Sequence, residues 1–190
     1  MVISEELRQL RDEAEAALAP HFANVDRISA VCTEKVLESF RAHRVSESHF
    51  APTTGYGYDD KGRDTLDEIY ADVLGTEAAF VRHSITSGTH ALTIGLFGLL
   101  RPGDTLLSVT GAPYDTLREA IGIQGDAFGS LRFYGVDYAQ VELAEDGEAD
   151  LPAIAEAVRR IRPAAVATQR SRGYGQRRAL SSEEIGEICR

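Results

Sequence analysis

Short apolar strands alternate with helices over the second half of the chain, and this alternation constrains the fold more than any other feature. The strand-like segments are Ala78–Ser84, Thr105–Val109, Leu131–Val136, Tyr138–Leu143 and Ala164–Thr168. The helical segments between and after them are His90–Leu100, Tyr114–Ile121, Leu151–Ile161 and a last one that opens with an S-x-x-E capping box at Ser181. Such an order predicts an α/β fold with a mainly parallel sheet that helices cover on both faces.

The N-terminal third has a different pattern. Ser4–Leu18 is helical in pattern and Pro20 is expected to stop it, because proline removes a backbone donor. A second helix is expected from Asn24 or Asp26 to His43, with apolar residues on one stripe. The segment Ser46–Arg63, rich in tyrosine and glycine, predicts an ordered but irregular loop.

These patterns suggest two parts, a helical arm with the Tyr/Gly loop (residues 1–63) and an incomplete binding domain (residues 64–190). The second part begins with a short helix that Asp64 can cap and Gly75 can close. The arm either packs on a partner subunit or belongs to the core. Its apolar surface leads us to expect a homo-oligomer, a dimer or a tetramer.

Charge and cysteine content exclude several classes of protein. A formal charge of −10 and an isoelectric point near 5.0 argue against binding to nucleic acids or anionic membranes. The longest apolar run, Ala91–Leu100, is too short to span a bilayer.

Cys32 and Cys189 lie far apart and outside any CxxC context, which favours a reducing cytoplasm. The five histidines show no metal-site spacing, so no metal is expected.

The turn Ser87-Gly88-Thr89 lies where a predicted strand meets a predicted helix. Free backbone N–H groups and the helix dipole at such a turn can bind phosphate, and the two hydroxyls can add donors. The alternative is an ordinary N-cap. The turn is neither a Walker loop nor a dinucleotide fingerprint, since the sequence has no GxxxxGK[ST] and no GxGxxG motif.

Two further segments follow predicted strands, where ligands bind in open α/β sheets. Tyr114 could stack on a flat ring there, or it could simply pack a loop. The segment Gln169–Tyr174 carries two arginines that could contact a carboxylate or phosphate, or could be a solvated basic loop.

The order of these features resembles the large domain of fold-type-I pyridoxal-phosphate enzymes of the cystathionine/methionine lyase group. Three long segments carry a closer resemblance, to the aluminium-resistance or methionine gamma-lyase-like family. They are TTGYGYDDKGRDTLDEIYADVLGTEAAFVRHSITSGTHAL, LRPGDTLLSVTGAPYDTLREAIG and QRSRGYGQRRALSSEEI. The resemblance covers nearly the whole chain and implies pyridoxal 5'-phosphate as cofactor.

The resemblance also implies roles for individual residues. The cofactor phosphate would lie at Ser87, Gly88 and Thr89, and the pyridine ring would stack on Tyr114. Tyr58 matches the tyrosine that reaches the phosphate of a neighbouring subunit. The family has an arginine two positions later, where this chain has Asp60, so Arg63 is the nearest basic alternative. Ser171 and Arg172 fall where the group contacts the 3-oxygen of the cofactor.

The catalytic residues of the family have no match within these 190 residues. The family needs a lysine that forms a Schiff base with the cofactor and an aspartate on the pyridine nitrogen. Both would be expected beyond Arg190. The chain has only two lysines, Lys35 and Lys61, and neither matches the family position. We therefore expect the isolated chain to be inactive.

The leading hypothesis is a parent carbon–sulfur lyase that eliminates a thiol from a sulfur amino acid. Beta elimination (cystathionine, cysteine) and gamma elimination (methionine) both remain open. Alternatives are an aldolase-like or aminotransferase-like enzyme with the same cofactor, and a non-catalytic partner that binds the full-length enzyme.

Overall fold

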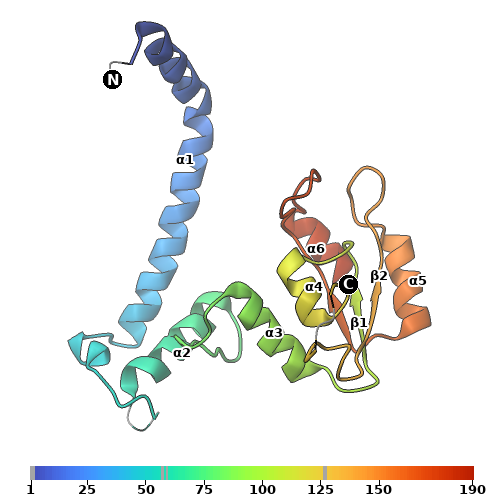
Figure 1. Cartoon of the computed structure of the whole chain (residues 1–190). Coiled ribbons are helices and arrows are strands. Elements are labelled where there is room, and N and C mark those ends of the chain that lie inside the picture. Colours follow the sequence, from blue (N-terminus) through green and yellow to red (C-terminus); the bar gives the residue numbers. More distant parts are fainter. Residues whose placement is uncertain (1–2, 57, 59, 126–127) are drawn as a thin grey trace. The chain divides into compact units, whose positions relative to one another are not determined.

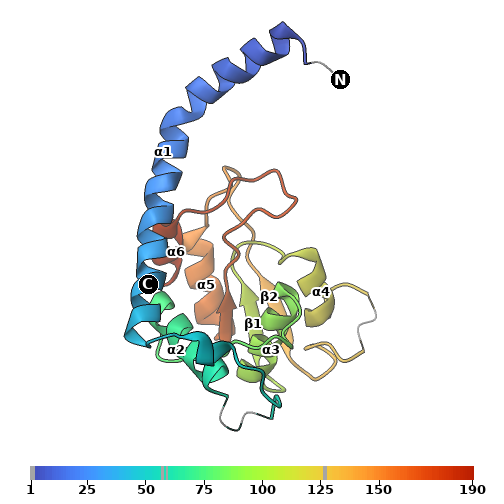
Figure 2. The ribbon, with the colours of Figure 1, turned by 90° about the vertical axis from the view of Figure 1, so that its left-hand side faces the viewer.

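The computed structural model describes residues 3–56, 58, 60–125 and 128–190 (Figures 1 and 2). Two positions of the predicted Tyr/Gly loop, 57 and 59, therefore lie outside the described residues. The chain divides into two compact units, Met1–Ser84 and Ile85–Arg190. Each unit is described by itself below.

A single long helix, α1 (Glu5–Ala42), begins the first unit. Ser4 caps it by accepting a hydrogen bond from the N–H of Leu7 at 3.4 Å. The expected break at Pro20 is wrong, because this proline lies inside the helix. A proline removes one backbone hydrogen bond, and the alanine-rich sequence before it favours helix strongly enough to continue.

The rest of the first unit consists of a 3-10 turn, η1 (Glu47–Phe50), and helix α2 (Lys61–Leu74). The helix is capped by Asp60 and not, as expected, by Asp64, since an Asp60 oxygen accepts from the N–H of Arg63 at 3.1 Å. Gly75 closes it in the left-handed conformation, as expected, with φ of 67°.

His43 fastens the C-terminal end of α1 to α2. Its Nε2 lies 2.7 Å from an Asp72 oxygen and its Nδ1 lies 3.1 Å from a Glu68 oxygen. The Ser39 hydroxyl donates to Asp72 at 3.0 Å. The His43 imidazole, followed by the Ser39 hydroxyl, holds the pKa of Asp72 below its ordinary value.

The predicted strand Ala78–Ser84 is wrong, because these residues are irregular in the structure. Their backbone is held by a side chain instead of a neighbouring strand. The N–H of Val81 donates to Asp67 at 2.7 Å, and Arg82 donates to both Asp67 oxygens at 2.7 and 2.8 Å. Desolvation raises the pKa of Asp67, but the Val81 and Arg82 hydrogen bonds outweigh it and the pKa is lowered.

The second unit is an α/β domain with a parallel sheet, as predicted. Its elements are α3 (Gly88–Leu99), β1 (Thr105–Ser108), α4 (Asp115–Ile121), β2 (Asp137–Gln140), α5 (Leu151–Ile161), β3 (Ala165–Ala167) and α6 (Ser182–Ile188). The three described strands follow the order β2-β1-β3, so β1 is central. Leu107 of β1 pairs with Ala139 of β2 and Val166 of β3.

Helices cover both faces of this sheet, and Figure 1 shows α4 and α5 on opposite sides of it. Leu106, 1% exposed, packs in a cluster with Ile121 of α4, while its neighbour Leu107, 0% exposed, packs with Ile154 and Ala157 of α5. Successive residues of a strand point to opposite faces, so β1 contributes to both core layers.

The predicted strand Leu131–Val136 is also wrong. The N–H of Val136 donates to the carbonyl of Leu131 at 3.0 Å, which closes a turn, and Gly135 has φ of 82°. Leu131 and Val136 are nevertheless buried, at 2% and 3% exposure. The apolar pattern predicted burial correctly, but a glycine with positive φ bends the backbone into a turn.

Candidate functional site

The predicted phosphate turn lies at the N-terminus of α3. Ser87 is the N-cap, and its hydroxyl accepts from the N–H of His90 at 3.1 Å. The N-cap interpretation is thus confirmed, and the cap uses the N–H of His90, while the N–H groups of Gly88 and Thr89 have no acceptor within the helix. A Cβ added at Gly88 would meet no heavy atom within 4 Å, so the space above this residue is open. A helix N-terminus with open space beside it is the kind of position where anions bind in proteins.

One hydrogen bond joins this turn to the segment that carries the predicted aromatic residue. The hydroxyl of Thr89 lies 2.7 Å from that of Thr116, in the first turn of α4. Tyr114 comes immediately before that helix and is its N-cap. The phosphate turn and the aromatic residue are therefore close in the fold, although they are far apart in the sequence.

A cavity of about 570 Å³ opens beside Tyr114. The loop after β1 and the loop after β3 line it, with Gln169, Arg172 and Tyr174 contributing from the second loop. The Tyr114 and Tyr174 rings lie 5.8 Å apart at 31°. The hydrogen bond with the Tyr174 hydroxyl, followed by desolvation, raises the pKa of Tyr114 above 10.0.

The loop after β3 is held in place by two arginines, Arg178 and Arg177, of which Arg177 also lines the cavity. Arg177 donates to the carbonyls of Gln169 and Ser171 at 2.9 and 2.7 Å. Arg178 pairs with Glu184 at 2.6 Å. The Arg178 guanidinium and the N–H of Ser181 lower the pKa of Glu184 to about 2. These hydrogen bonds stabilise one conformation of the loop, because a movement of the loop would break them.

The two residues predicted to contact the cofactor 3-oxygen occupy different places on this loop. Arg172 lines the cavity. Ser171 is exposed, and its carbonyl already accepts bonds from Gln169 and Arg177. Of the two, the geometry favours Arg172 for a contact with an anion inside the cavity.

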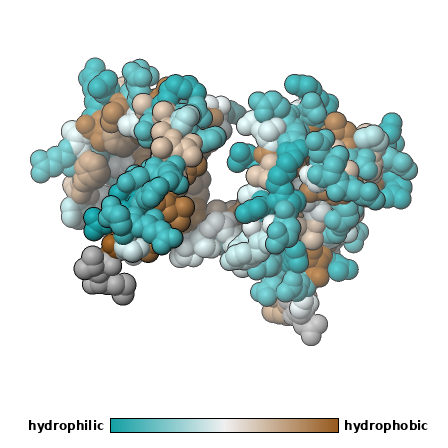
Figure 3. All heavy atoms as spheres, turned by 90° about the horizontal axis from the view of Figure 1, so that it is seen from above, coloured by the Kyte–Doolittle hydropathy of each residue, from teal (hydrophilic) through white to brown (hydrophobic). Residues whose placement is uncertain are grey.

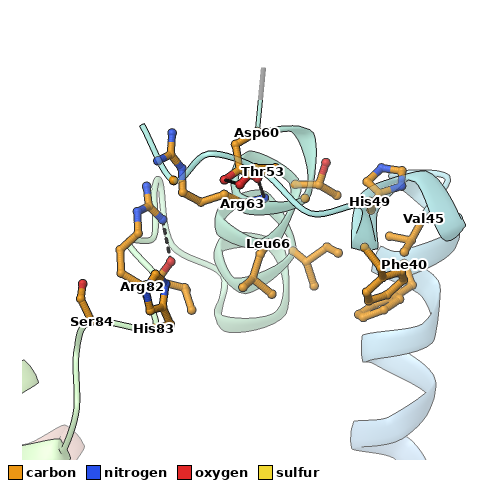
Figure 4. Close-up of a pocket in the computed structure, with 16 residues that line it drawn as sticks. Phe40, Val45, His49, Thr53, Asp60, Arg63, Leu66, Arg82, His83 and Ser84 are labelled. Atoms are coloured by element: carbon orange, nitrogen blue, oxygen red, sulfur yellow. Dashed lines mark hydrogen bonds between the residues drawn. The ribbon is translucent and has the colours of Figure 1, made fainter. Parts of the chain in front are cut away.

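Tyr58 and Arg63 belong to the first unit, so the structure does not bring them together with the other site residues inside one unit. Tyr58 is 85% exposed. Arg63 lines a separate cavity of about 480 Å³ between the end of α1 and α2. Figure 4 shows Arg63 beside Asp60, whose carboxylate accepts from the Thr53 hydroxyl at 3.0 Å.

Sequence reasoning missed Thr116, named Gln169 only as the first residue of the segment Gln169–Tyr174, and missed Arg177. Their roles come from contacts across 27, 55 and 8 residues of chain. The one usable signal was position, because Thr116 and Gln169 both follow the ends of parallel strands, where ligands bind.

The described residues contain no cluster of three or more histidine, cysteine or acidic side chains that could hold a metal ion. Within the same part of the chain, every helix is too short or too polar to cross a bilayer. Cys32 and Cys189 are free and exposed.

The fold and the site define an α/β protein in which the N-terminal turn of one helix lies near an aromatic residue that follows a central strand. Residues 7–190 match the family model described as methionine gamma-lyase. The chain belongs to this family, which confirms the resemblance found in the sequence.

Individual relatives agree with this assignment. The chain is 48% identical over 185 residues to the uncharacterized protein YnbB of Bacillus subtilis (strain 168), covering 97% of this chain and 44% of YnbB. A crystal structure from Listeria innocua, named "putative cystathionine beta-lyase involved in aluminum resistance", is 44% identical with a TM-score of 0.91, covering 98% of this chain and 45% of that one. A carbon–sulfur lyase involved in aluminum resistance from Clostridium novyi NT is 43% identical with a TM-score of 0.91, at 98% and 44% coverage. The chain thus spans less than half the length of these relatives.

Proposed function

We propose that this chain contributes the N-terminal part of a pyridoxal-phosphate-dependent carbon–sulfur lyase that acts on a sulfur amino acid. Family membership and the names of the two crystal structures support the reaction class. The observation that supports the site is the hydrogen bond between Thr89 and Thr116, because it joins the proposed phosphate turn to the helix that Tyr114 caps. We further propose that the enzyme works in the cytoplasm, which the free Cys32 and Cys189 support.

The residues present fit the cofactor. The open space at Gly88 accommodates a phosphate, which would accept hydrogen bonds from the backbone of the α3 N-terminus and from the Thr89 hydroxyl. Tyr114 offers an aromatic face to a planar ring, and Arg172 offers a guanidinium to an oxyanion. When bound, the cofactor would supply the electron sink for loss of the α-proton. The chain's own residues would hold and orient it.

A glycine substitution tests the site without disturbing the fold. In Gly88→Val the new side chain enters open space, so the free energy of unfolding should stay within about 0.5 kcal/mol of the parent. We expect the affinity for pyridoxal phosphate, followed by quenching of tyrosine fluorescence, to fall at least about tenfold, since the side chain fills the phosphate position.

Gly95→Val is the matched control, because Gly95 lies on the same helix and also faces open space. It should bind like the parent. Equal binding by Gly88→Val and Gly95→Val would contradict the proposed phosphate position. A parent chain that does not bind the cofactor would contradict the proposed function for this chain.

We also propose that α1 packs against a second copy of the chain. Large apolar side chains along the helix are at least 45% exposed, namely Leu7, Leu10, Leu18, Phe22, Val25, Ile28, Val31 and Leu37. Its hydrogen bonds to α2 come from Ser39 and His43, near its C-terminal end. Figure 3 shows hydrophobic residues at the surface among hydrophilic ones. A helix of 38 residues is roughly 57 Å long, enough for a helix-pair interface.

An aspartate on the apolar stripe should separate the copies. Ile28→Asp is expected to shift the chain from dimer or tetramer to monomer in sedimentation equilibrium, because a buried carboxylate without a partner is costly. Ala30→Asp, roughly 200° around the helix, is the control and should leave the assembly unchanged. A parent chain that is monomeric at all concentrations, or equal effects of the two variants, would contradict this interface.

A further inference from the structure

Gln169 joins two loops that are distant in the sequence. Its Oε1 accepts from the backbone N–H of Tyr114 at 2.8 Å, and its Nε2 donates to the carbonyl of Ser171 at 3.0 Å. A backbone N–H can only donate and a carbonyl can only accept, so these partners fix the orientation of the amide. One side chain thus connects the start of α4 with the loop after β3.

The backbone of Gln169 is itself anchored. Its N–H donates to the hydroxyl of Thr110 at 2.8 Å, and Thr110 is only 4% exposed. Its carbonyl accepts from Arg177 at 2.9 Å. The side-chain amide therefore extends from a backbone that is fixed just after β3. If either loop moved and the amide moved with it, the hydrogen bond of the amide to the other loop would break.

The loop after β3 packs directly against the ring of Tyr114, which the other connected loop carries. A Cβ added at Gly173 would lie 3.1 Å from Cδ2 of Tyr114, so the loop backbone runs directly against that ring. Tyr174 follows, with its ring centroid 5.8 Å from that of Tyr114. A shift of either loop would change the width of the cavity beside Tyr114.

We infer that Gln169 is a positioning residue, which holds the Tyr114 ring at a set distance from the loop Arg170–Arg177 and so fixes the shape of the cavity between them. The identity of the ligand that binds in this cavity rests on the function proposed above, but the geometry that Gln169 controls does not. Gln169 contacts the backbone of Tyr114 and Ser171 and not their side chains. Backbone groups are the same in every residue type, so the identities of residues 114 and 171 do not reveal this contact.

Three variants test the inference. Gln169→Met removes both hydrogen bonds at nearly constant volume. Gln169→Leu also removes both hydrogen bonds and adds no charge beside the Tyr114 ring, so it serves as a second test if Gln169→Met does not fold. Gln176→Met is the control, because Gln176 lines the same cavity from the same loop.

The first measurement needs no ligand. Isotope-labelled tyrosine allows an NMR titration of the Tyr114 ring, whose pKa is raised by its bond with Tyr174. In Gln169→Met we expect that pKa to fall toward the ordinary value of a tyrosine, while circular dichroism stays unchanged. Gln176→Met should titrate like the parent. An unchanged Tyr114 titration in Gln169→Met would overturn the inference, and if that variant does not fold, the same result in Gln169→Leu would do so.

The second measurement uses ligands. Gln169→Met should bind pyridoxal phosphate about tenfold more weakly than the parent, with unchanged affinity for inorganic phosphate, since only the ring site is displaced. Parental affinity for pyridoxal phosphate in Gln169→Met would overturn the positioning role. A parent chain that does not bind the cofactor would refute the proposed function, whereas a shifted Tyr114 titration in Gln169→Met would still support the role of Gln169.

Discussion

The 190-residue chain is expected to release no pyruvate or 2-oxobutyrate from cysteine, cystathionine or methionine when pyridoxal phosphate is added. The chemistry needs a lysine amine at the cofactor aldehyde and a base for the α-proton. The two lysines are Lys35 in α1 and Lys61 at the start of α2, both in the first unit, whereas Tyr114 and the phosphate turn lie in the second. Loss of acid–base catalysis alone costs about 10²–10⁴ in rate.

Borohydride reduction followed by peptide mapping checks this expectation directly. It should find no specific attachment of the cofactor to either lysine, and Lys35→Arg and Lys61→Arg serve as controls for non-specific labelling. Robust turnover with specific trapping at one lysine would refute the prediction. Cofactor binding without turnover would fit both a part of a larger lyase and a non-catalytic partner protein.

Leu107→Ala should destabilise the second unit by about 2–5 kcal/mol. Leu107 lies in the central strand, is 0% exposed, and packs with Val109, Ile154 and Ala157. Its truncation would leave a cavity between the sheet and α5, in a domain whose total stability is only about 5–15 kcal/mol. Urea denaturation followed by circular dichroism measures the loss.

Leu99→Ala is the matched control for this core variant. Leu99 is 71% exposed at the end of α3, so the same truncation should change stability by less than about 0.5 kcal/mol. Similar unfolding midpoints for the two variants would show that the layer around Leu107 is not the core of the unit.

Local signals predicted the helices well where cap and periodicity agreed. Asp150 and Ser181 cap α5 and α6 as expected, because a side-chain oxygen that accepts a backbone N–H needs only nearby residues. At Pro20 one local rule failed, since the cost of a missing hydrogen bond must be weighed against the helix on both sides.

Strands were less predictable, because a strand depends on its neighbours. Thr105–Val109 became β1 with partners on both sides. Ala78–Ser84 has a similar apolar character, yet Asp67 takes the backbone donor of Val81 and the segment stays irregular. The apolar pattern of a short segment reports burial, while hydrogen bonding to another strand decides its conformation.

The sequence by itself determined the α/β class and the family, because these depend on patterns along the chain, and from such patterns it also predicted the phosphate turn and Tyr114 as site residues. Only the tertiary structure decided which side chains complete the site. Thr116 meets Thr89, and Gln169 meets Tyr114, through hydrogen bonds that span 27 and 55 residues. Such bonds require the parallel strands to bring their carboxyl ends to one edge of the sheet, and no local pattern encodes the partners that meet there.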